Sequence, residues 1–161
     1  MKRADLLPAV ALLIARIGFG GFMMTHGWGK LQMLLARDFE NFADPIGLGK
    51  PLSLTMATFA EFGCALLVIV GLGTRLATIP LIITMAVAAL VVHGSDPWTS
   101  GDAARLFFAG ETDFPKSKEP ALLFLTAFVT LLLTGPGKFS LDAVLWPRLR
   151  RGSRGSAAQK G

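Results

Sequence analysis

Residues 6–35, LLPAVALLIARIGFGGFMMTHGWGKLQMLL, form an apolar stretch whose only charged side chains are Arg16 and Lys30. A bilayer core about 30 Å thick is crossed by roughly 20 helical residues, so this stretch can span a membrane and project beyond it. The charged start and apolar run are also typical of a signal peptide. However, the apolar run continues past Arg16 to Met24, and no polar mature sequence follows a small-residue cleavage site. We expect an uncleaved first membrane helix.

Three further segments have the composition of membrane helices, and they cover residues 52–72, 76–93 and 119–134. The last has an apolar centre, ALLFLTAFVTLLL, that is short enough to fit a buried helix as well. Pro120 suits the first turn of this helix, and GPG at 135–137 ends it. A hydrophobic content of 52% in 161 residues is high for a soluble protein. We therefore expect an all-α, integral membrane four-helix bundle over residues 1–145 and a basic, flexible cytoplasmic tail over 146–161.

The distribution of charge predicts the orientation of these helices. With the N-terminus inside, the inner segments hold nine basic and two acidic residues, whereas the outer segments hold five basic and eight acidic residues. This asymmetry follows the positive-inside rule and places both termini in the cytoplasm, which requires an even number of spans. Most of the basic excess lies in the tail, where Arg148 to Arg154 can contact anionic lipid heads. Basic residues are not interleaved with aromatic ones, so we expect no nucleic-acid partner.

The connections between the segments differ in length. GLGTR at 71–75 is so short that the helices on either side must be antiparallel neighbours. The segment at 94–118 is long for a structureless loop, and AARLFFAG within it predicts a short interfacial helix.

Arg16 and Glu61 are charged residues inside membrane helices, and each costs roughly 2.5 to 3.5 kcal/mol at a helix centre on insertion scales. Counted from the expected helix ends, both lie about 14–15 Å deep, near the midplane of the bilayer. The sequence therefore predicts a structural ion pair between Arg16 and Glu61. The alternative is that they form the polar core of a ligand or proton site.

Polar residues also gather at the outer end of the first helix. His26 and Lys30 share a face with Arg16, and His93 ends the third helix at a similar depth. A quinone head group needs a few hydrogen bonds near the interface beside an apolar slot, so His26, Lys30, Glu61, Arg16 and His93 are candidate ligand-binding residues. Haem ligation by His26 and His93 is a weaker alternative, because their spacing is not specific. Cys64 is the only cysteine, which excludes an intrachain disulfide and a cysteine-rich metal site, and we expect no metal.

Several segments together resemble the DoxX family of small bacterial inner-membrane proteins. They are ARIGFGGFMMTHGWGKL, AEFGCALLVIVGLGTRLA, HGSDPW and EPALLFLTAFVTLLLTGPGKFSLD. The resemblance implies a multi-pass four-helix protein of the inner membrane, in a family named for a component linked to terminal quinol oxidase and thiosulfate:quinone oxidoreductase. Other members look like partners in membrane redox, thiol or metal stress systems.

Three functions remain open on the sequence. The first is a membrane subunit of a quinone-linked oxidoreductase or redox-stress system, which binds a quinone near the outer leaflet. The second is a non-enzymatic scaffold for a redox or metal-handling partner, and the weakest is a small proton-coupled carrier that uses Glu61. The chain holds no self-contained catalytic motif, so no catalytic residue is assigned and any enzyme activity would belong to a complex. The glycines of the first helix also permit a homo-oligomer in the lipid bilayer.

Overall fold

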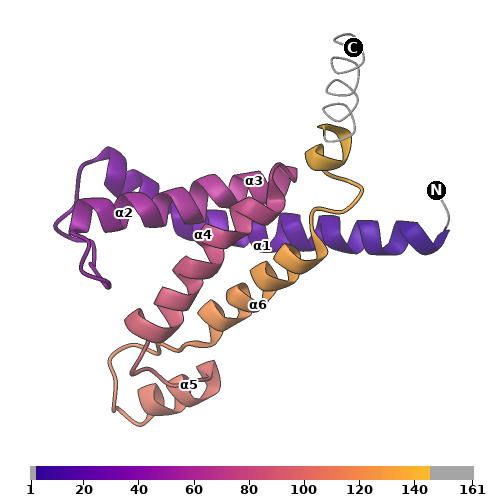
Figure 1. Ribbon diagram of the computed structural model, residues 1–161. Helices are drawn as coiled ribbons and strands as arrows, with labels where there is room; N and C mark the ends of the chain where they lie inside the picture. The colour runs from indigo at the N-terminus through magenta and orange to yellow at the C-terminus, as the bar shows by residue number, and fades with distance from the viewer. Residues whose placement is uncertain (1–2, 146–161) are drawn as a thin grey trace.

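A computed structural model describes residues 3–145, and these residues form helices and no strands (Figure 1). The helices are α1 (Arg3–Leu35), α2 (Lys50–Thr58), η1 (Phe59–Cys64), α3 (Ala65–Val70), α4 (Thr74–Val87), η2 (Ala88–Val92), α5 (Ser100–Phe108) and α6 (Glu119–Thr134). The all-helical expectation is confirmed. The expected basic tail at 146–161 lies outside the described residues.

Two of the longer helical runs are continuous through a change of helix type. α2, η1 and α3 follow one another without a break, and so do α4 and η2. In the π-helical segments η1 and η2 each turn takes up an extra residue, and short segments of this kind are frequent at functional sites. The expected interfacial segment also contains a helix, α5, whose position relative to lipid stays a prediction.

The helices form two packed pairs. α1 lies against the run formed by α2, η1 and α3, whereas α4 packs chiefly against α6. In Figure 1 the pair of α4 and α6 runs obliquely away from α1, so α2 and α4 diverge from the region of η1 and α3. Met23, Leu81 and Phe128 are fully buried where α1, α4 and α6 meet.

Gly20 and Gly27 set how closely α1 approaches its partner. A Cβ atom on Gly20 would lie 2.7 Å from a side-chain carbon of Ile69, and one on Gly27 would lie 2.6 Å from the backbone of Glu61. Small residues at these positions allow two helix backbones to come together. These contacts also fix the antiparallel register of the pair.

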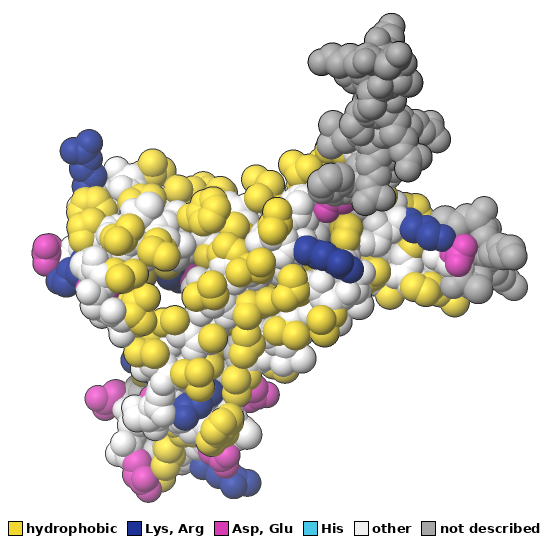
Figure 2. Space-filling view, viewed as in Figure 1, with side chains coloured by type: hydrophobic (Ala, Val, Ile, Leu, Met, Phe, Trp, Pro, Cys, Tyr) yellow, Lys and Arg dark blue, Asp and Glu magenta, His cyan; other side chains and the backbone are white. Residues whose placement is uncertain are grey.

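Three helical runs are long and apolar enough to cross a bilayer, namely Asp5–Leu35, Lys50–Val70 and Thr74–Val92. α6, at Glu119–Thr134, is a shorter apolar helix, so the count of four spans and the orientation of the termini stay predictions. Figure 2 shows hydrophobic side chains over much of the middle of one face, with most charged side chains toward its ends. A surface of this kind is suited to contact with lipid.

Candidate functional site

A pocket of about 340 Å³ lies in the wedge where α2 and α4 diverge. Its walls come from α1, the 36–49 segment, α2, η1, α4, η2 and α6, and most of the lining side chains are apolar. Its polar lining residues are His26, Lys30, Ser53, Glu61, Thr84 and His93. Small-molecule sites have this composition, with volumes of about 300–1,000 Å³ and a few polar groups in apolar walls.

An ion pair between Lys30 and Glu61 is the strongest polar feature of the pocket. The Nζ atom of Lys30 donates a hydrogen bond to Oε2 of Glu61 at 2.5 Å, and the two side chains are 26% and 6% exposed. Gly27 makes this contact attainable, because any side chain there would hold α1 away from η1. Removing one partner of such a pair leaves a poorly solvated charge. Each of the two residues therefore keeps the charge of the other from being buried without a partner.

His93 lies on the wall formed by η2 and has a carboxylate partner. The backbone N–H of His93 donates to the carbonyl of Ala88 at 2.8 Å, five residues earlier, which is the hydrogen bond that defines a π-helical turn. Its Nδ1 atom lies 2.7 Å from Oδ2 of Asp96. A carboxylate on one ring nitrogen fixes the orientation of an imidazole and leaves Nε2 as the nitrogen that can meet a ligand.

His26 reaches the pocket from α1 through aromatic packing. Its ring lies edge-on to the ring of Phe124 of α6, with centroids 5.8 Å apart, and Phe124 stacks on Phe128. His26 remains exposed, unlike Glu61. This contact links His26 of α1 to Phe124 of α6, and both residues line the pocket.

The predicted ion pair between Arg16 and Glu61 is wrong. Arg16 is 1% exposed and donates to the backbone carbonyl of Phe139, whereas Glu61 bonds to Lys30. The reason is the register of α1, which places Gly27 against Glu61 and Arg16 against Gly71. Arg16 and Gly27 are eleven residues apart, so Arg16 lies roughly 16 Å along the helix from the level of Glu61.

Arg16 belongs instead to a clamp at the other end of the bundle, formed with the turn at 71–73 and the segment at 135–142. Asp142 accepts hydrogen bonds from the backbone N–H groups of Gly73, at 2.8 Å, and Thr74, at 3.1 Å, while its own N–H donates to the carbonyl of Gly71. Gly71 has a φ of 73°, and a Cβ there would collide with the guanidinium of Arg16. These contacts tie the segment after α6 to the start of α4.

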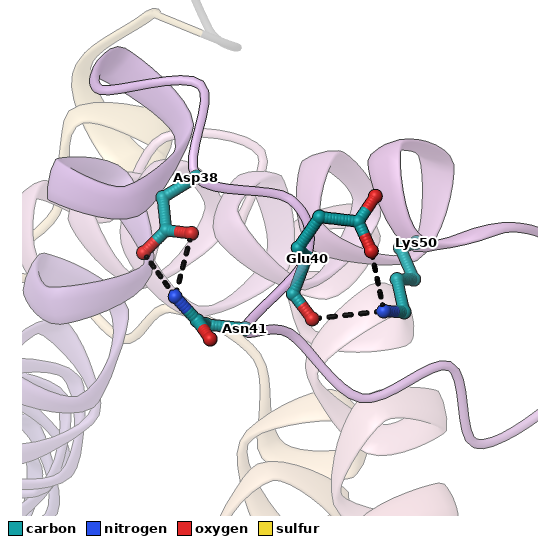
Figure 3. Close-up of polar contacts among 4 residues, drawn as sticks. All are labelled: Asp38, Glu40, Asn41 and Lys50. Atoms are coloured by element: carbon teal, nitrogen blue, oxygen red, sulfur yellow. Dashed lines mark hydrogen bonds and ion pairs between the residues drawn. The ribbon is translucent and has the colours of Figure 1, made fainter.

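The 36–49 segment forms one side of the pocket. Phe42, Ala43, Pro45, Ile46 and Leu48 line the pocket from this side. Figure 3 shows two of the contacts that hold the segment: Lys50 Nζ donates to the backbone carbonyl of Glu40 at 2.8 Å and to its Oε2 at 2.9 Å, and Asn41 Nδ2 donates to both carboxylate oxygens of Asp38. The segment is therefore bonded to the start of α2 and within itself.

Asp44 attaches the same segment to α2. Its carboxylate accepts hydrogen bonds from Ser53 Oγ at 2.6 Å, from the backbone N–H of Gly49 at 2.7 Å and from that of Leu48 at 3.0 Å. The bond from Ser53 and those from the backbone favour the charged form and hold the pKa of Asp44 below its ordinary value. Asp44 thus ties the 36–49 segment to the side chain of Ser53 and to the two residues that precede α2.

A family model described as DoxX matches residues 11–94, which is more than half of the chain. The chain belongs to the DoxX family. The matched range contains Arg16, His26, Lys30, Glu61 and His93, and the family together with the three long apolar helices identifies a membrane protein. No curated protein and no solved structure matches the chain.

Of the five residues that the sequence suggests for ligand binding, His26, Lys30, Glu61 and His93 line one pocket, and Arg16 does not. Asp96 and Phe124 were missed by the sequence reasoning. The sequence did contain a signal for Asp96, because HGSDPW places a carboxylate three residues after His93. It contained no signal for Phe124, because the contact of Phe124 with His26 depends on how α6 packs across the bundle.

Proposed function

We propose that this DoxX protein is a membrane subunit of a quinone-linked oxidoreductase or redox-stress system, and that its pocket binds a quinone head near the outer leaflet. The observation that carries the proposal is the convergence of His26, Lys30, Glu61 and His93 on one largely apolar pocket. The two carbonyl oxygens of a quinone accept hydrogen bonds. Lys30 Nζ is a donor of the required kind that lines the pocket. With Nδ1–H of a neutral His93 donating to Asp96, Nε2 of His93 is an acceptor, which suits a hydroxyl of the reduced quinol.

The orientation that goes with this proposal has both termini in the cytoplasm and α6 as a short fourth span. Both ends carry charges of both signs, as the pairs Lys138–Asp5 and Lys50–Glu40 show. Acidic residues outnumber basic ones in the 36–49 and 94–119 segments, and this excess supports a pocket on the outer side. Within the bacterial inner membrane, a quinone head would then sit near the outer headgroups.

The test is a search for bound quinone in the full-length protein, purified gently and analysed by mass spectrometry after lipid extraction. We expect a quinone in wild-type protein and its loss in Glu61→Gln. Glu40→Gln is the matched control, because Glu40 also pairs with a lysine, at 2.9 Å, but is 89% exposed and does not line the pocket. A wild-type sample that contains no quinone and takes up none when a quinone is added would end the proposal.

A second function, the non-enzymatic scaffold, is favoured by the outer segment at 94–118. Trp98, Phe108 and Phe114 are 66%, 83% and 67% exposed there, and aromatic residues of this kind are enriched at binding surfaces. Cross-linking in native membranes tests this function, with Phe108→Ser expected to lower capture of a reproducible partner chain. If wild-type protein captures no partner reproducibly, the scaffold function fails.

A further inference from the structure

We propose that the pocket opens sideways into the bilayer, through a mouth between Met56 of α2 and Ile83 of α4, and that its ligand is a tailed quinone dissolved in the membrane. The proposal excludes, as the natural ligand, a ring compound without a tail that enters the pocket from water. This inference rests on the proposed function, and it adds the route and the ligand class.

Five large hydrophobic side chains line the pocket and are yet about half exposed. Met56 and Ile83, at 50% and 57%, lie inside membrane-long helical runs, whereas Ile46 and Leu48 belong to the 36–49 segment and Val92 ends its run. Met56 and Ile83 therefore identify the mouth. Both lie in helical runs that are long and apolar enough to span a membrane, so their outer surfaces face acyl chains. Figure 2 shows a hollow, rimmed by hydrophobic side chains, between the α2 region and the end of α4. This view looks across the length of α1, so the hollow opens on the side of the bundle and not at its end.

The outer end of the pocket is covered. The 36–49 segment places Phe42, Ile46 and Leu48 over it, and Asp44 bonds this segment to Ser53 of α2. Lys50 and Glu40 add a second attachment, which Figure 3 shows. A ligand from the water phase would have to displace this bonded, apolar cover, whereas a ligand from the bilayer meets an apolar opening.

The polar groups of the pocket then decide how the ligand lies. Lys30 and Glu61 are at the α1–η1 contact, on the inner wall of the wedge, while Met56 and Ile83 are at its lipid-facing side. A quinone whose ring contacts Lys30 must direct its tail back through the mouth. The apolar rim accepts such a tail without exposing it to water.

The experiment measures equilibrium binding of two probes to the full-length protein by native mass spectrometry. The probes are decylubiquinone and the same benzoquinone head without its tail. Met56→Trp and Ile83→Trp narrow the mouth, and the matched controls are Leu52→Trp and Ile79→Trp, one helical turn earlier on the same helices. Leu52 and Ile79 are 50% and 44% exposed and do not line the pocket.

We expect each mouth variant to weaken decylubiquinone binding about tenfold or more, and to change binding of the tail-less head by less than about twofold. The control variants should change neither. If wild-type protein binds both probes but the mouth variants weaken both equally, or weaken neither, the side mouth is wrong and the proposed function stands. If wild-type protein binds neither probe, the proposed function itself fails.

Discussion

The ion pair between Lys30 and Glu61 predicts an unequal response to removing its two partners. Lys30→Met leaves the Glu61 carboxylate 6% exposed with no cation beside it, whereas Glu61→Gln leaves an ammonium group that is already 26% exposed. Breaking a buried pair costs about 3–5 kcal/mol, and a long lysine side chain can move its charge toward water. We therefore expect Lys30→Met to lower the free energy of unfolding by about 3 kcal/mol and Glu61→Gln to lower it by about half as much.

The assay is reversible unfolding in mixed micelles, followed by circular dichroism as denaturing detergent is added, for wild-type protein, both single variants and the double variant. Replacing both partners removes the buried charges together, so the double variant should be less destabilised than the sum of the single variants by about 2 kcal/mol. Lys50→Met with Glu40→Gln is the matched cycle on an exposed pair, which should give a coupling energy below about 1 kcal/mol.

The reasoning is refuted if the Lys30 and Glu61 substitutions are additive within about 0.5 kcal/mol, because residues in contact must couple. It is also refuted if Glu61→Gln is the more damaging of the two changes. That result would mean that an unpaired Lys30 ammonium costs more stability than an unpaired Glu61 carboxylate. The exposures of the two side chains, 26% and 6%, predict the reverse.

Two other regions give predictions of the same kind. Gly27→Ala should lower the free energy of unfolding by about 1–3 kcal/mol in the same assay, because its Cβ would press on the backbone of η1, while Gly29→Ala, which meets nothing within 4 Å, should lower it little or not at all. Asp44 has a pKa below its ordinary value of 3.8 in the folded protein, so its stabilising effect is full above that value and is lost as the pH falls through the folded pKa. The protection factors of the Leu48 and Gly49 amides, which correct for the intrinsic pH dependence of hydrogen exchange, should fall with this acidification in wild-type protein and should already be low at neutral pH in Asp44→Asn. Equal protection factors in both proteins at every pH would show that Asp44 does not hold the segment.

Hydropathy and turn chemistry predicted much of the fold, because both are local properties of the chain. The expected segment at 76–93 corresponds to the run Thr74–Val92, and GLGTR does form a tight turn between two helical runs, which splay apart beyond it. The π-helical segments could not be predicted in this way. They change the hydrogen bonding of a few residues and leave the apolar pattern of η1 and η2 intact.

The partner of each buried charge could not be predicted either, because it depends on the register between helices. Counting inward from assumed membrane boundaries placed Arg16 and Glu61 at one depth. The close contacts of Gly20 and Gly27 with the α2–η1–α3 run set a different register, and no feature of the sequence specifies them beyond the presence of glycine. Asp142 was missed for the same reason, since its contact with Gly73 joins segments 69 residues apart.

The observed register gives a physical reason for the two charges within the apolar part of α1. Arg16 and Lys30 are fourteen residues apart, about 21 Å along the helix, and residues 17–25 between them carry no charge. Arg16 meets the turn at 71–73 and the Phe139 carbonyl. Gly27 is level with Glu61, so Lys30 lies about one helical turn beyond and reaches back to the carboxylate. Glu61 is thus about 16 Å from the turn that Arg16 meets, which is close to half of a bilayer core about 30 Å thick. A carboxylate at that depth is costly without a cation beside it, and Lys30 supplies that cation.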